Sequence, residues 1–534
     1  MMNKHFSHIH LRLSLSLLLS ACLMGFSTGL QAQLSISWDQ TLGGTNLDVG
    51  KALITYSDGS SVIVGETNSQ DGDIQHPKGS RDVWVIRLNP QGQVIWNNNY
   101  GGSLDDVALD VVATPDKGLV FVGYSFSQDG DLTQNNGSAD YWIARLDSSG
   151  QMLWQRSYGG SSSESAQSLI STADGGFLVV GYSYSNNGEV VGHLGSADCW
   201  VLKLNFLGQL QWQAIFGGTD EEWATDVIAT QDGGYAFCGW TASSDGDITL
   251  AQGAQDAWVV KLDQTGHLQW QSSVGGTASD KASALVEDAQ GNLFISGHTF
   301  SQDGDIENPK GASDFWMFSL ADSGSLRWSR NYGGSGDDRA TALIRQNDGT
   351  LVLAGRTFSS DGDVSRKEGF FDFWVMRTDD QGSLEWEHAF GGTEADYAHA
   401  IAPLPNDRLL VVGETFSDNG DISSPPAGSN DLWVAALQPW STPIEPDLTP
   451  QMSLECYPNP TTDQVFLTLR TEQPSLGKLE LLDLSGRTLW EWEVPPSTQP
   501  LHFSWSKEHL PAGQYFFRWT TPTGSITKKI MAIH

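Results

Sequence analysis

The chain has 534 residues, with 29 basic and 64 acidic side chains and a formal net charge of −35. Hydrophobic residues make up 39% of the sequence, which is enough for a large folded core and too much for a disordered chain. The acidic excess argues against wrapping of nucleic acid and against attachment to an anionic membrane, because both reward lysine and arginine. Four cysteines in this length cannot form a disulfide framework.

The N-terminus has the features of an export signal. Lys4 and Arg12 flank the start of an apolar run, Leu13–Phe26, that is too short for a membrane span. We therefore predict a signal peptide over residues 1–32. The tetrapeptide at residues 19–22, Leu-Ser-Ala-Cys, leaves a lipoprotein signal open as the alternative.

Tryptophan recurs through the middle of the chain with a fixed period of 58 residues. One series keeps this spacing throughout: Trp38, Trp96, Trp154, Trp212, Trp270, Trp328 and Trp386. A second series keeps it until its last member, which comes one residue late: Trp84, Trp142, Trp200, Trp258, Trp316, Trp374 and Trp433. Such a period, without a helical pattern, is typical of an array of β-units.

Each repeat has the pattern of four antiparallel strands. In the second repeat we predict strands over residues 108–114, 119–125, 141–146 and 151–158, separated by turns and loops rich in Asp and Gly. Four antiparallel strands per repeat form the blade of a β-propeller. The repeats lack the signatures of WD-repeats and kelch units.

The two ends of the array predict how it closes. It opens at Leu34 with the tryptophan strand that ends a blade, and it finishes at residues 431–437 with the strand that comes before it. Pairing of these two strands would complete a seventh blade and leave no exposed sheet edge. We therefore predict an all-β fold with a seven-bladed β-propeller over residues 33–437.

The last part of the chain has a different pattern. A proline-bearing linker, residues 438–451, precedes predicted strands at residues 465–469, 478–482 and 514–519. Alternating strands bounded by Pro and Gly turns predict a small immunoglobulin-like β-sandwich over residues 452–534.

Four motifs in this segment resemble the C-terminal sorting domain of the type IX secretion system of Bacteroidota. In chain order the motifs are Tyr-Pro-Asn-Pro, Leu-Asp-Leu-Ser-Gly-Arg, Leu-Pro-Ala-Gly-Gln-Tyr and a final Lys-Lys-Ile. The sorting-motif residues within them are Tyr457, Pro458, Asn459, Pro460, Gly486, Gly513, Tyr515 and Lys529. The resemblance implies that the protein binds the type IX secretion machinery. It also implies that the protein passes from the periplasm through the outer membrane and resides outside the cell or on its surface. The repeats resemble, more loosely, the Gly- and Asp-rich propeller repeats that are often fused to such domains.

Three positions of the repeat are acidic in every copy. The first column is Asp48, Asp106, Glu164, Glu222, Asp280, Asp338 and Asp396. The second is Asp73, Asp131, Glu189, Asp247, Asp305, Asp363 and Asp421. The third is Asp82, Asp140, Asp198, Asp256, Asp314, Asp372 and Asp431. We expect all three columns at the same end of the blades, as a rim of carboxylates.

Two interpretations of these carboxylates stay open. Each Asp can accept hydrogen bonds from loop N–H groups and so hold the long loop of its repeat. Alternatively, the carboxylate oxygens bind calcium, although the loops lack the full spacing of an EF-hand. The candidate calcium ligands are Asp73, Asp82, Asp131, Asp140, Asp247, Asp256, Asp305, Asp314, Asp363 and Asp372.

Ligand specificity is expected at positions that differ between repeats. Two such columns are Glu66, Tyr124, Tyr182, Trp240, His298, Arg356 and Glu414, and Val49, Val107, Ser165, Trp223, Lys281, Arg339 and Tyr397. Aromatic and charged groups along one rim can stack on and hydrogen-bond a sugar or a peptide. The ligand-binding candidates are Tyr124, Tyr182, Trp223, Trp240, His298, Arg339, Arg356 and Tyr397. The alternative is that these positions vary because nothing constrains them.

Enzyme motifs are missing from the sequence: it has no G-x-S-x-G, no P-loop and no H-E-x-x-H, and we assign no catalytic residue. The sequence favours an exported, non-catalytic protein that binds a glycan or another protein. A propeller-type polysaccharide hydrolase or lyase that uses rim carboxylates is one alternative. A structural surface-layer protein is the other.

Overall fold

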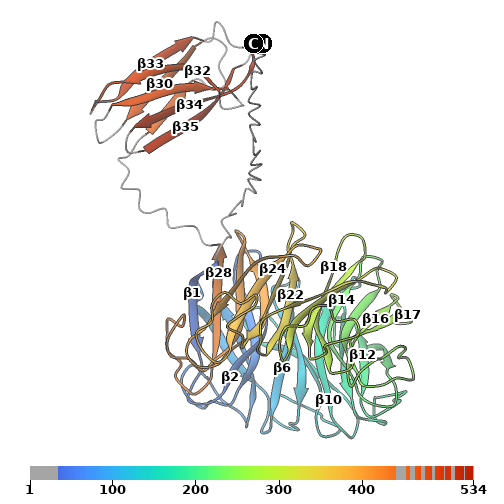
Figure 1. Cartoon of the computed structure of the whole chain (residues 1–534). Helices are drawn as coiled ribbons and strands as arrows, with labels where there is room; N and C mark the ends of the chain where they lie inside the picture. Colours follow the sequence, from blue (N-terminus) through green and yellow to red (C-terminus); the bar gives the residue numbers. More distant parts are fainter. Residues whose placement is uncertain are drawn as a thin grey trace, which may run out of the picture. The chain divides into compact units, whose positions relative to one another are not determined.

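The computed structural model describes residues 34–439 and, further on, residues 453–457, 464–470, 476–483, 487–497, 499–506, 511–521 and 524–532. The chain divides into two compact units, residues 1–439 and 440–534 (Figure 1). The predicted signal peptide and all but the first two residues of the predicted linker lie outside the described residues. No helix in the described parts is long and apolar enough to cross a membrane.

The first unit consists of four-stranded antiparallel sheets, and six of them use four consecutive strands each. The first two are β2 (Asp48–Thr55), β3 (Ser61–Thr67), β4 (Asp82–Leu88) and β5 (Val94–Tyr100), and β6 (Asp106–Ala113), β7 (Leu119–Ser125), β8 (Asp140–Leu146) and β9 (Met152–Tyr158). The next two are β10 (Glu164–Ser171), β11 (Phe177–Ser183), β12 (Asp198–Leu204) and β13 (Leu210–Phe216), and β14 (Glu222–Ala229), β15 (Tyr235–Thr241), β16 (Asp256–Leu262) and β17 (Leu268–Val274). The last two are β18 (Asp280–Glu287), β19 (Leu293–Thr299), β20 (Asp314–Leu320) and β21 (Leu326–Tyr332), and β22 (Asp338–Arg345), β23 (Leu351–Thr357), β24 (Asp372–Thr378) and β25 (Leu384–Phe390).

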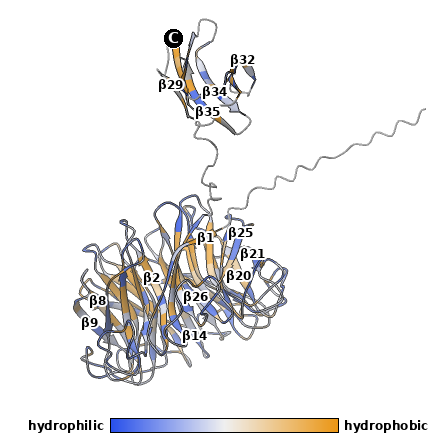
Figure 2. Ribbon diagram, turned by 90° about the vertical axis from the view of Figure 1, so that its left-hand side faces the viewer, coloured by the Kyte–Doolittle hydropathy of each residue, from blue (hydrophilic) through white to orange (hydrophobic). Residues whose placement is uncertain are grey.

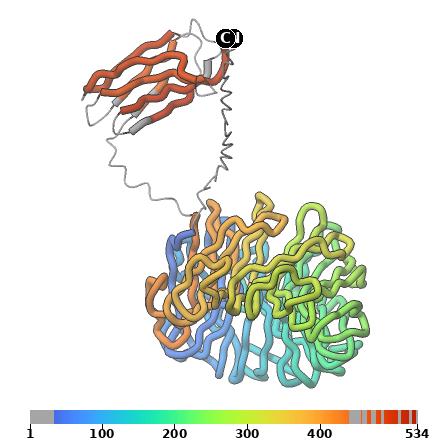
Figure 3. Tube along the Cα trace, viewed as in Figure 1, coloured from blue at the N-terminus to red at the C-terminus, as the bar shows by residue number. Residues whose placement is uncertain are grey.

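One further sheet joins the two ends of this unit. It has the order β1 (Leu34–Leu42), β28 (Asp431–Pro439), β27 (Arg408–Thr415) and β26 (Asp396–Leu404). Strand β1 pairs antiparallel with β28, from Leu34 opposite Pro439 to Leu42 opposite Leu432. In Figure 3 the dark blue start of the unit accordingly runs beside its orange end.

Neighbouring sheets pack on each other through their apolar faces. The first strands of successive sheets, β2, β6, β10, β14, β18, β22 and β26, contact one another in this order, and β26 also contacts β2. The tryptophans of the third strands, such as Trp142 and Trp200, are fully buried between sheets. Hydrophobic residues accordingly concentrate in the strands of this unit (Figure 2). One core position per repeat therefore accounts for seven of the 21 tryptophans.

The observed strands agree with the sequence pattern. The four strands predicted in the second repeat are β6 to β9, with ends that differ by two residues at most. The all-β class is confirmed, since the repeats form antiparallel sheets of four strands. The same Gly and Asp turns that mark the repeats in the sequence connect these strands.

The second unit contains two antiparallel sheets. One has the order β29 (Ser453–Tyr457), β30 (Gln464–Arg470) and β33 (Leu501–Ser506). The other has the order β32 (Thr488–Val494), β31 (Gly477–Leu482), β34 (Gly513–Thr521) and β35 (Gly524–Ala532). Buried residues of both sheets, including Leu467, Leu481 and Trp519, form one hydrophobic core.

Candidate functional site

The acidic columns are largely buried. Residues of the first column start the first strand of each sheet and are fully buried, and those of the third column start the third strand and are at most 2% exposed. Two of the three columns of the expected rim of carboxylates are therefore buried beneath the loops. The loops close over these side chains because the loop N–H groups need acceptors.

One repeat shows how each carboxylate is used. The Asp106 carboxylate accepts hydrogen bonds from Gly102 N at 2.7 Å and from Ser127 Oγ at 2.8 Å, both to Oδ2. In the second column, Asp131 Oδ2 accepts a hydrogen bond from Gly101 N at 3.0 Å. In the third column, the Asp140 carboxylate accepts one from Asn136 N at 2.7 Å. These bonds recur in the other repeats, which explains why paired glycines and the Asp-Gly-Asp loop are found in nearly every copy.

The hydrogen bonds give the carboxylates a role without a metal. No group of three or more His, Cys, Asp or Glu side chains in the described part of the chain is placed to hold a metal ion. In five third-column residues, however, the Oδ1 atom is buried without a hydrogen-bond partner: Asp140, Asp198, Asp256, Asp372 and Asp431. Burial and the charges of Glu164 and Glu189 raise the pKa of Asp140 to about 6. Calcium binding stays a prediction.

The two variable columns are neighbours across the first and second strands of each sheet. Trp223 lies opposite Trp240, Lys281 opposite His298, and Arg339 opposite Arg356. The intervening glycine permits this arrangement, since a Cβ atom at Gly239 would lie 1.8 Å from the carbonyl oxygen of Trp223. The first strand also changes register beside this glycine, between Ala224 and Asp226. Together the columns form one row along the ends of the strands.

Three aromatic rings occupy one part of this row. The rings of Tyr182 and Trp223 stack with their centroids 3.9 Å apart and an interplanar angle of 16°. Trp223 also contacts Trp240, whose ring centroid is 5.2 Å away. Trp223 is half-buried, whereas Trp240 is only 5% exposed. Lys281 Nζ lies 4.0 Å from the centroid of the Trp240 ring.

Basic side chains continue the row in the next sheets. The Arg339 guanidinium lies 5.2 Å from the Phe300 ring and forms a two-point ion pair with Asp337, with both N···O distances 2.7 Å. The Arg356 guanidinium lies 4.9 Å from the Tyr397 ring centroid. Burial, with the positive charges of Arg339 and Lys281, lowers the pKa of His298 to about 3, so this imidazole is neutral at physiological pH. The row thus passes from aromatic to cationic across adjacent sheets.

The acidic members of the row are paired. Glu66 forms ion pairs with Lys51 at 3.3 Å and Arg81 at 2.7 Å. Glu414 Oε1 accepts a hydrogen bond from His399 Nε2 at 3.1 Å, and burial lowers the pKa of His399. Seven of the predicted ligand-binding residues belong to one chain of contacts or cross-strand pairs, in which Lys281 and Phe300 are the connecting residues: Tyr182, Trp223, Trp240, His298, Arg339, Arg356 and Tyr397. The eighth candidate, Tyr124, packs on Phe126 in its own sheet.

A second polar group, which the sequence reasoning missed, lies deeper along the first strands. Ser168 Oγ is 2.9 Å from Asp110 Oδ2 and 3.1 Å from Asp226 Oδ1, and it belongs to the sheet between theirs. The other four sheets have alanine at this position: Ala52, Ala284, Ala342 and Ala400. Polar residues at this position in three consecutive repeats, against alanine in the others, were the sequence signal from which this group could have been predicted. Burial and the charge of Asp226 raise the pKa of Asp110 to about 7, and burial raises the pKa of Asp226 to about 6.

We expect this group to make stability depend on pH. A carboxyl with a raised pKa in the folded chain contributes stability that is complete below its unfolded pKa of about 3.8 and is lost as the pH rises through 6 to 7. Asp226→Asn should remove about 1 kcal/mol of the stability loss between pH 5 and pH 8. A folded-state pKa of about 6 confines the loss from Asp226 to the unit between pH 5 and pH 6, about 1.4 kcal/mol at most, and the partial exposure of the carboxyl reduces it. Thermal unfolding at constant ionic strength measures this; identical pH slopes in the two proteins would contradict it.

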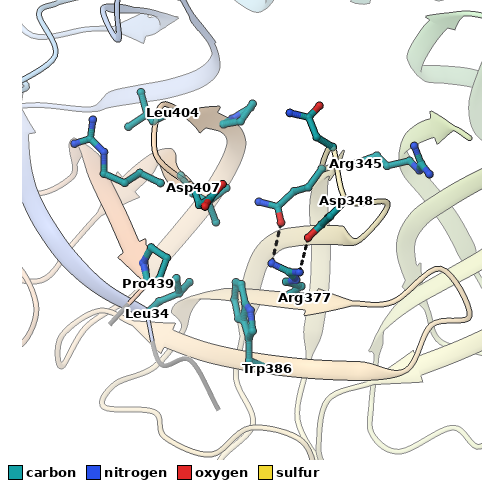
Figure 4. Close-up of a pocket in the computed structure, with 13 residues that line it drawn as sticks. Leu34, Arg345, Asp348, Arg377, Trp386, Leu404, Asp407 and Pro439 are labelled. Atoms are coloured by element: carbon teal, nitrogen blue, oxygen red, sulfur yellow. Dashed lines mark hydrogen bonds and ion pairs between the residues drawn. The ribbon is translucent and has the colours of Figure 1, made fainter. Parts of the chain in front are cut away.

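A pocket of about 400 Å³ lies at the opposite end of the strands (Figure 4). Arg345, Arg377 and Arg408 line it together with Trp386. Arg377 donates hydrogen bonds to Asp348 Oδ2 at 2.8 Å and Gln346 Oε1 at 3.1 Å, and its charge is therefore already paired. The same pairing of a third-strand cation with a turn aspartate occurs in other repeats, for example Arg145 with Asp116. This pocket is thus built from a repeated structural ion pair.

Comparison with known proteins identifies the C-terminal unit. Residues 455–533 match the family model of the secretion system C-terminal sorting domain. This segment is a type IX sorting domain. The protein is therefore exported to the cell surface or secreted, and its sorting domain interacts with the secretion machinery. Within the motif, Pro458, Asn459, Pro460 and Gly486 lie outside the described residues, while Gly513 and Tyr515 begin β34 and Lys529 lies in β35.

The chain also has more distant likenesses. Over 136 residues, 24% of this chain, the sequence is 27% identical to the regulatory protein FlaEY of Caulobacter vibrioides, and the match spans only 14% of that protein's length. An apocarotenoid oxygenase variant of Synechocystis has a TM-score of 0.38 at 12% identity, covering 89% of this chain and 98% of its own. A puromycin hydrolase has a TM-score of 0.37 at 9% identity, covering 80% of this chain and 59% of its own. Scores this low carry no conclusion about activity.

Proposed function

We propose that the first unit is a closed seven-bladed β-propeller and that the protein is an exported, non-catalytic binding protein for a glycan or a protein ligand. The pairing of β1 with β28 supports closure, because it joins the chain's first strand to its last sheet. The contact of β26 with β2 supports it as well, since the first strands then meet in a complete cycle. A closed ring has no free sheet edge at its seam.

The remaining parts of the chain fit this proposal. A signal peptide over residues 1–32 would bring the chain to the periplasm, from which a type IX cargo of Bacteroidota leaves the cell. The propeller would then span residues 33–437 and be followed by a linker at residues 438–451. We assign residues 452–534 to an immunoglobulin-like sandwich, which the two sheets around one core support.

One observation carries the binding function: the stack of Tyr182 on Trp223, continued by Trp240. Half-buried, stacked rings at strand ends offer a flat face of fixed orientation, on which a sugar ring or a planar side chain can pack with little loss of conformational entropy. The tryptophans of the two 58-residue series pack in or against the core, whereas no other repeat has a tryptophan at the position of Trp223. The row therefore breaks the symmetry of the repeats at half-buried aromatic side chains, which supports a binding site there.

Binding and turnover can be separated experimentally. The purified protein is applied to a glycan array, and glycans that bind are then incubated with it while released reducing ends are measured. Binding without release of reducing ends supports the proposal. Release of reducing ends would instead favour a polysaccharide hydrolase, and absence of binding to the array together with binding to a surface protein would restrict the ligand to proteins.

We expect Trp223→Ala to weaken binding of the array's best glycan at least tenfold, since loss of an aromatic contact at the centre of a site costs about 2 kcal/mol or more. Isothermal titration calorimetry measures the affinity. The matched control is Trp212→Ala, which removes a half-buried tryptophan from β13 outside the row. Trp240 is unsuitable for this test, because burial makes Trp240→Ala a core truncation that should cost about 3–5 kcal/mol of stability. Equal affinities of the Trp223→Ala variant and the wild type would exclude the stack from the site.

A further inference from the structure

The row contains two cations that form no ion pair with a described residue, although the carboxylates of Glu221, Asp337 and Glu414 act on them from a greater distance. Arg339 and Arg356 lie directly opposite each other on β22 and β23, and Lys281 lies on the first strand of the preceding sheet. Arg339 is paired with Asp337, whereas neither Lys281 nor Arg356 forms an ion pair with any described residue. The Nε atom of Arg356 is buried and has no hydrogen-bond partner. In a chain with a net charge of −35, unpaired cations at one place are a specific feature.

These cations disfavour one another in the free protein. Like charges directly opposite each other on neighbouring strands are destabilising. Burial lowers the pKa of Lys281 and that of Arg356, and the charge of Arg339 acts in the same direction. The charges of Glu221 on Lys281, and of Asp337 and Glu414 on Arg356, act in the opposite direction without restoring the usual pKa. The fold nevertheless orients them: Lys281 lies over the Trp240 ring and Arg356 over the Phe371 and Tyr397 rings. Groups that are held in place at a cost in stability indicate a site for an opposite charge.

We propose that this part of the row binds the anionic groups of an acidic glycan, with carboxylate or sulfate against Arg356, Arg339 and Lys281 and a sugar face against the Tyr182–Trp223 stack. The inference rests on the proposed binding function and specifies its ligand. Guanidinium groups suit both anions, because their N–H donors match two oxygens at once. The acidic remainder of the protein repels long, densely charged polyanions, so the ligand carries isolated anionic groups among its sugars.

The aromatic part of the row favours a glycan over an acidic peptide. An acidic peptide would use the cations and leave the stacked Tyr182 and Trp223 rings without a partner of matching shape. A sugar chain uses both parts, because its rings present flat apolar faces and its substituents reach to either side. Single-stranded nucleic acid also combines stacking with negative charge. Its closely spaced phosphates, however, make it one of the densely charged polyanions that the net charge of the protein repels.

The test compares ligands that differ only in charge. The affinities of the full chain for trigalacturonic acid and for its methyl ester are measured by isothermal titration calorimetry, and a sulfated galactan trisaccharide and its desulfated form provide the second pair. We expect the charged member of at least one pair to bind at least tenfold more tightly than its neutral partner. The pair that shows the difference distinguishes a carboxylate from a sulfate ligand.

The variant Arg356→Gln should abolish that difference, because it weakens binding of the charged member far more than binding of the neutral member. Its melting temperature should equal or exceed that of the wild type, since a repulsion is relieved; a purely structural arginine would lower it. Lys281→Gln provides a second variant. The control is Arg327→Gln, near the start of β21 and outside the row. Equal binding of charged and neutral forms, with Trp223→Ala still weakening both, would overturn this inference and leave the binding function intact. Arg356-dependent binding of hexaglutamate or of oligothymidylate, with no binding of either glycan pair, would also overturn it.

Discussion

Removal of β1 is expected to unfold the first unit or bring it close to unfolding. A chain that begins at Gly43 lacks the edge strand of the sheet that joins the two ends, and β28 loses all its pairing on that side. Leu34 and Leu42 are buried in this sheet, and burial of a leucine contributes about 1.5–3 kcal/mol each. Their loss alone, roughly 3–6 kcal/mol, is a large fraction of the 5–15 kcal/mol that stabilises an ordinary domain.

The measurement is thermal unfolding followed by circular dichroism, with size-exclusion chromatography to detect association through the exposed β28 edge. A chain that begins at Leu34 is the reference, because it keeps the whole of β1. A synthetic peptide of residues 34–42 should restore part of the lost stability by adding back the missing strand, and a peptide of scrambled sequence should not. An unchanged melting temperature in the shorter chain would show that β1 contributes nothing and would remove the argument for a closed propeller.

Asp338→Ala is expected to lower the stability by about 4 kcal/mol. This carboxylate is fully buried and accepts hydrogen bonds from Gly334 N at 3.0 Å, Thr357 Oγ1 at 2.5 Å and Ser359 Oγ at 2.6 Å. The alanine side chain leaves all of these donors without an acceptor, and each buried donor without a partner costs about 1–3 kcal/mol. Relaxation of the loops towards water should recover part of the sum.

Chemical denaturation gives this free energy directly. The control is Asp380→Ala, an exposed aspartate in the turn between β24 and β25 of the same sheet, whose replacement should leave the midpoint close to that of the wild type. If both variants unfold at the wild-type midpoint, the invariant carboxylates do not hold the loops. A large stability loss in Asp338→Ala that calcium fails to alter would support hydrogen bonding as the role of this column.

The comparison of sequence with structure separates two kinds of information. The strands β6 to β9 and their turns follow from the alternation of apolar residues and from Gly and Asp at fixed places, because strand formation and turn geometry depend on neighbours in the chain. The sorting domain followed in the same way from short motifs near the C-terminus. The sequence also showed the invariant acidic columns, but it did not predict their burial. An aspartate near two glycines gives the same sequence pattern whether the loop covers its carboxylate or leaves it in solvent.

The sequence alone did not predict which side chains of different repeats contact each other. Ser168 reaches Asp110 and Asp226, each 58 residues away, only because the first strands of three sheets pack side by side. The stack of Tyr182 on Trp223, and Lys281 over Trp240, likewise join residues of different sheets. The sequence by itself determined the repeat, the strands and the destination of the protein, since local periodicity and short motifs encode these. Only the tertiary structure decided which carboxylates are buried and which variable side chains form one row, because both depend on how separate sheets pack against each other.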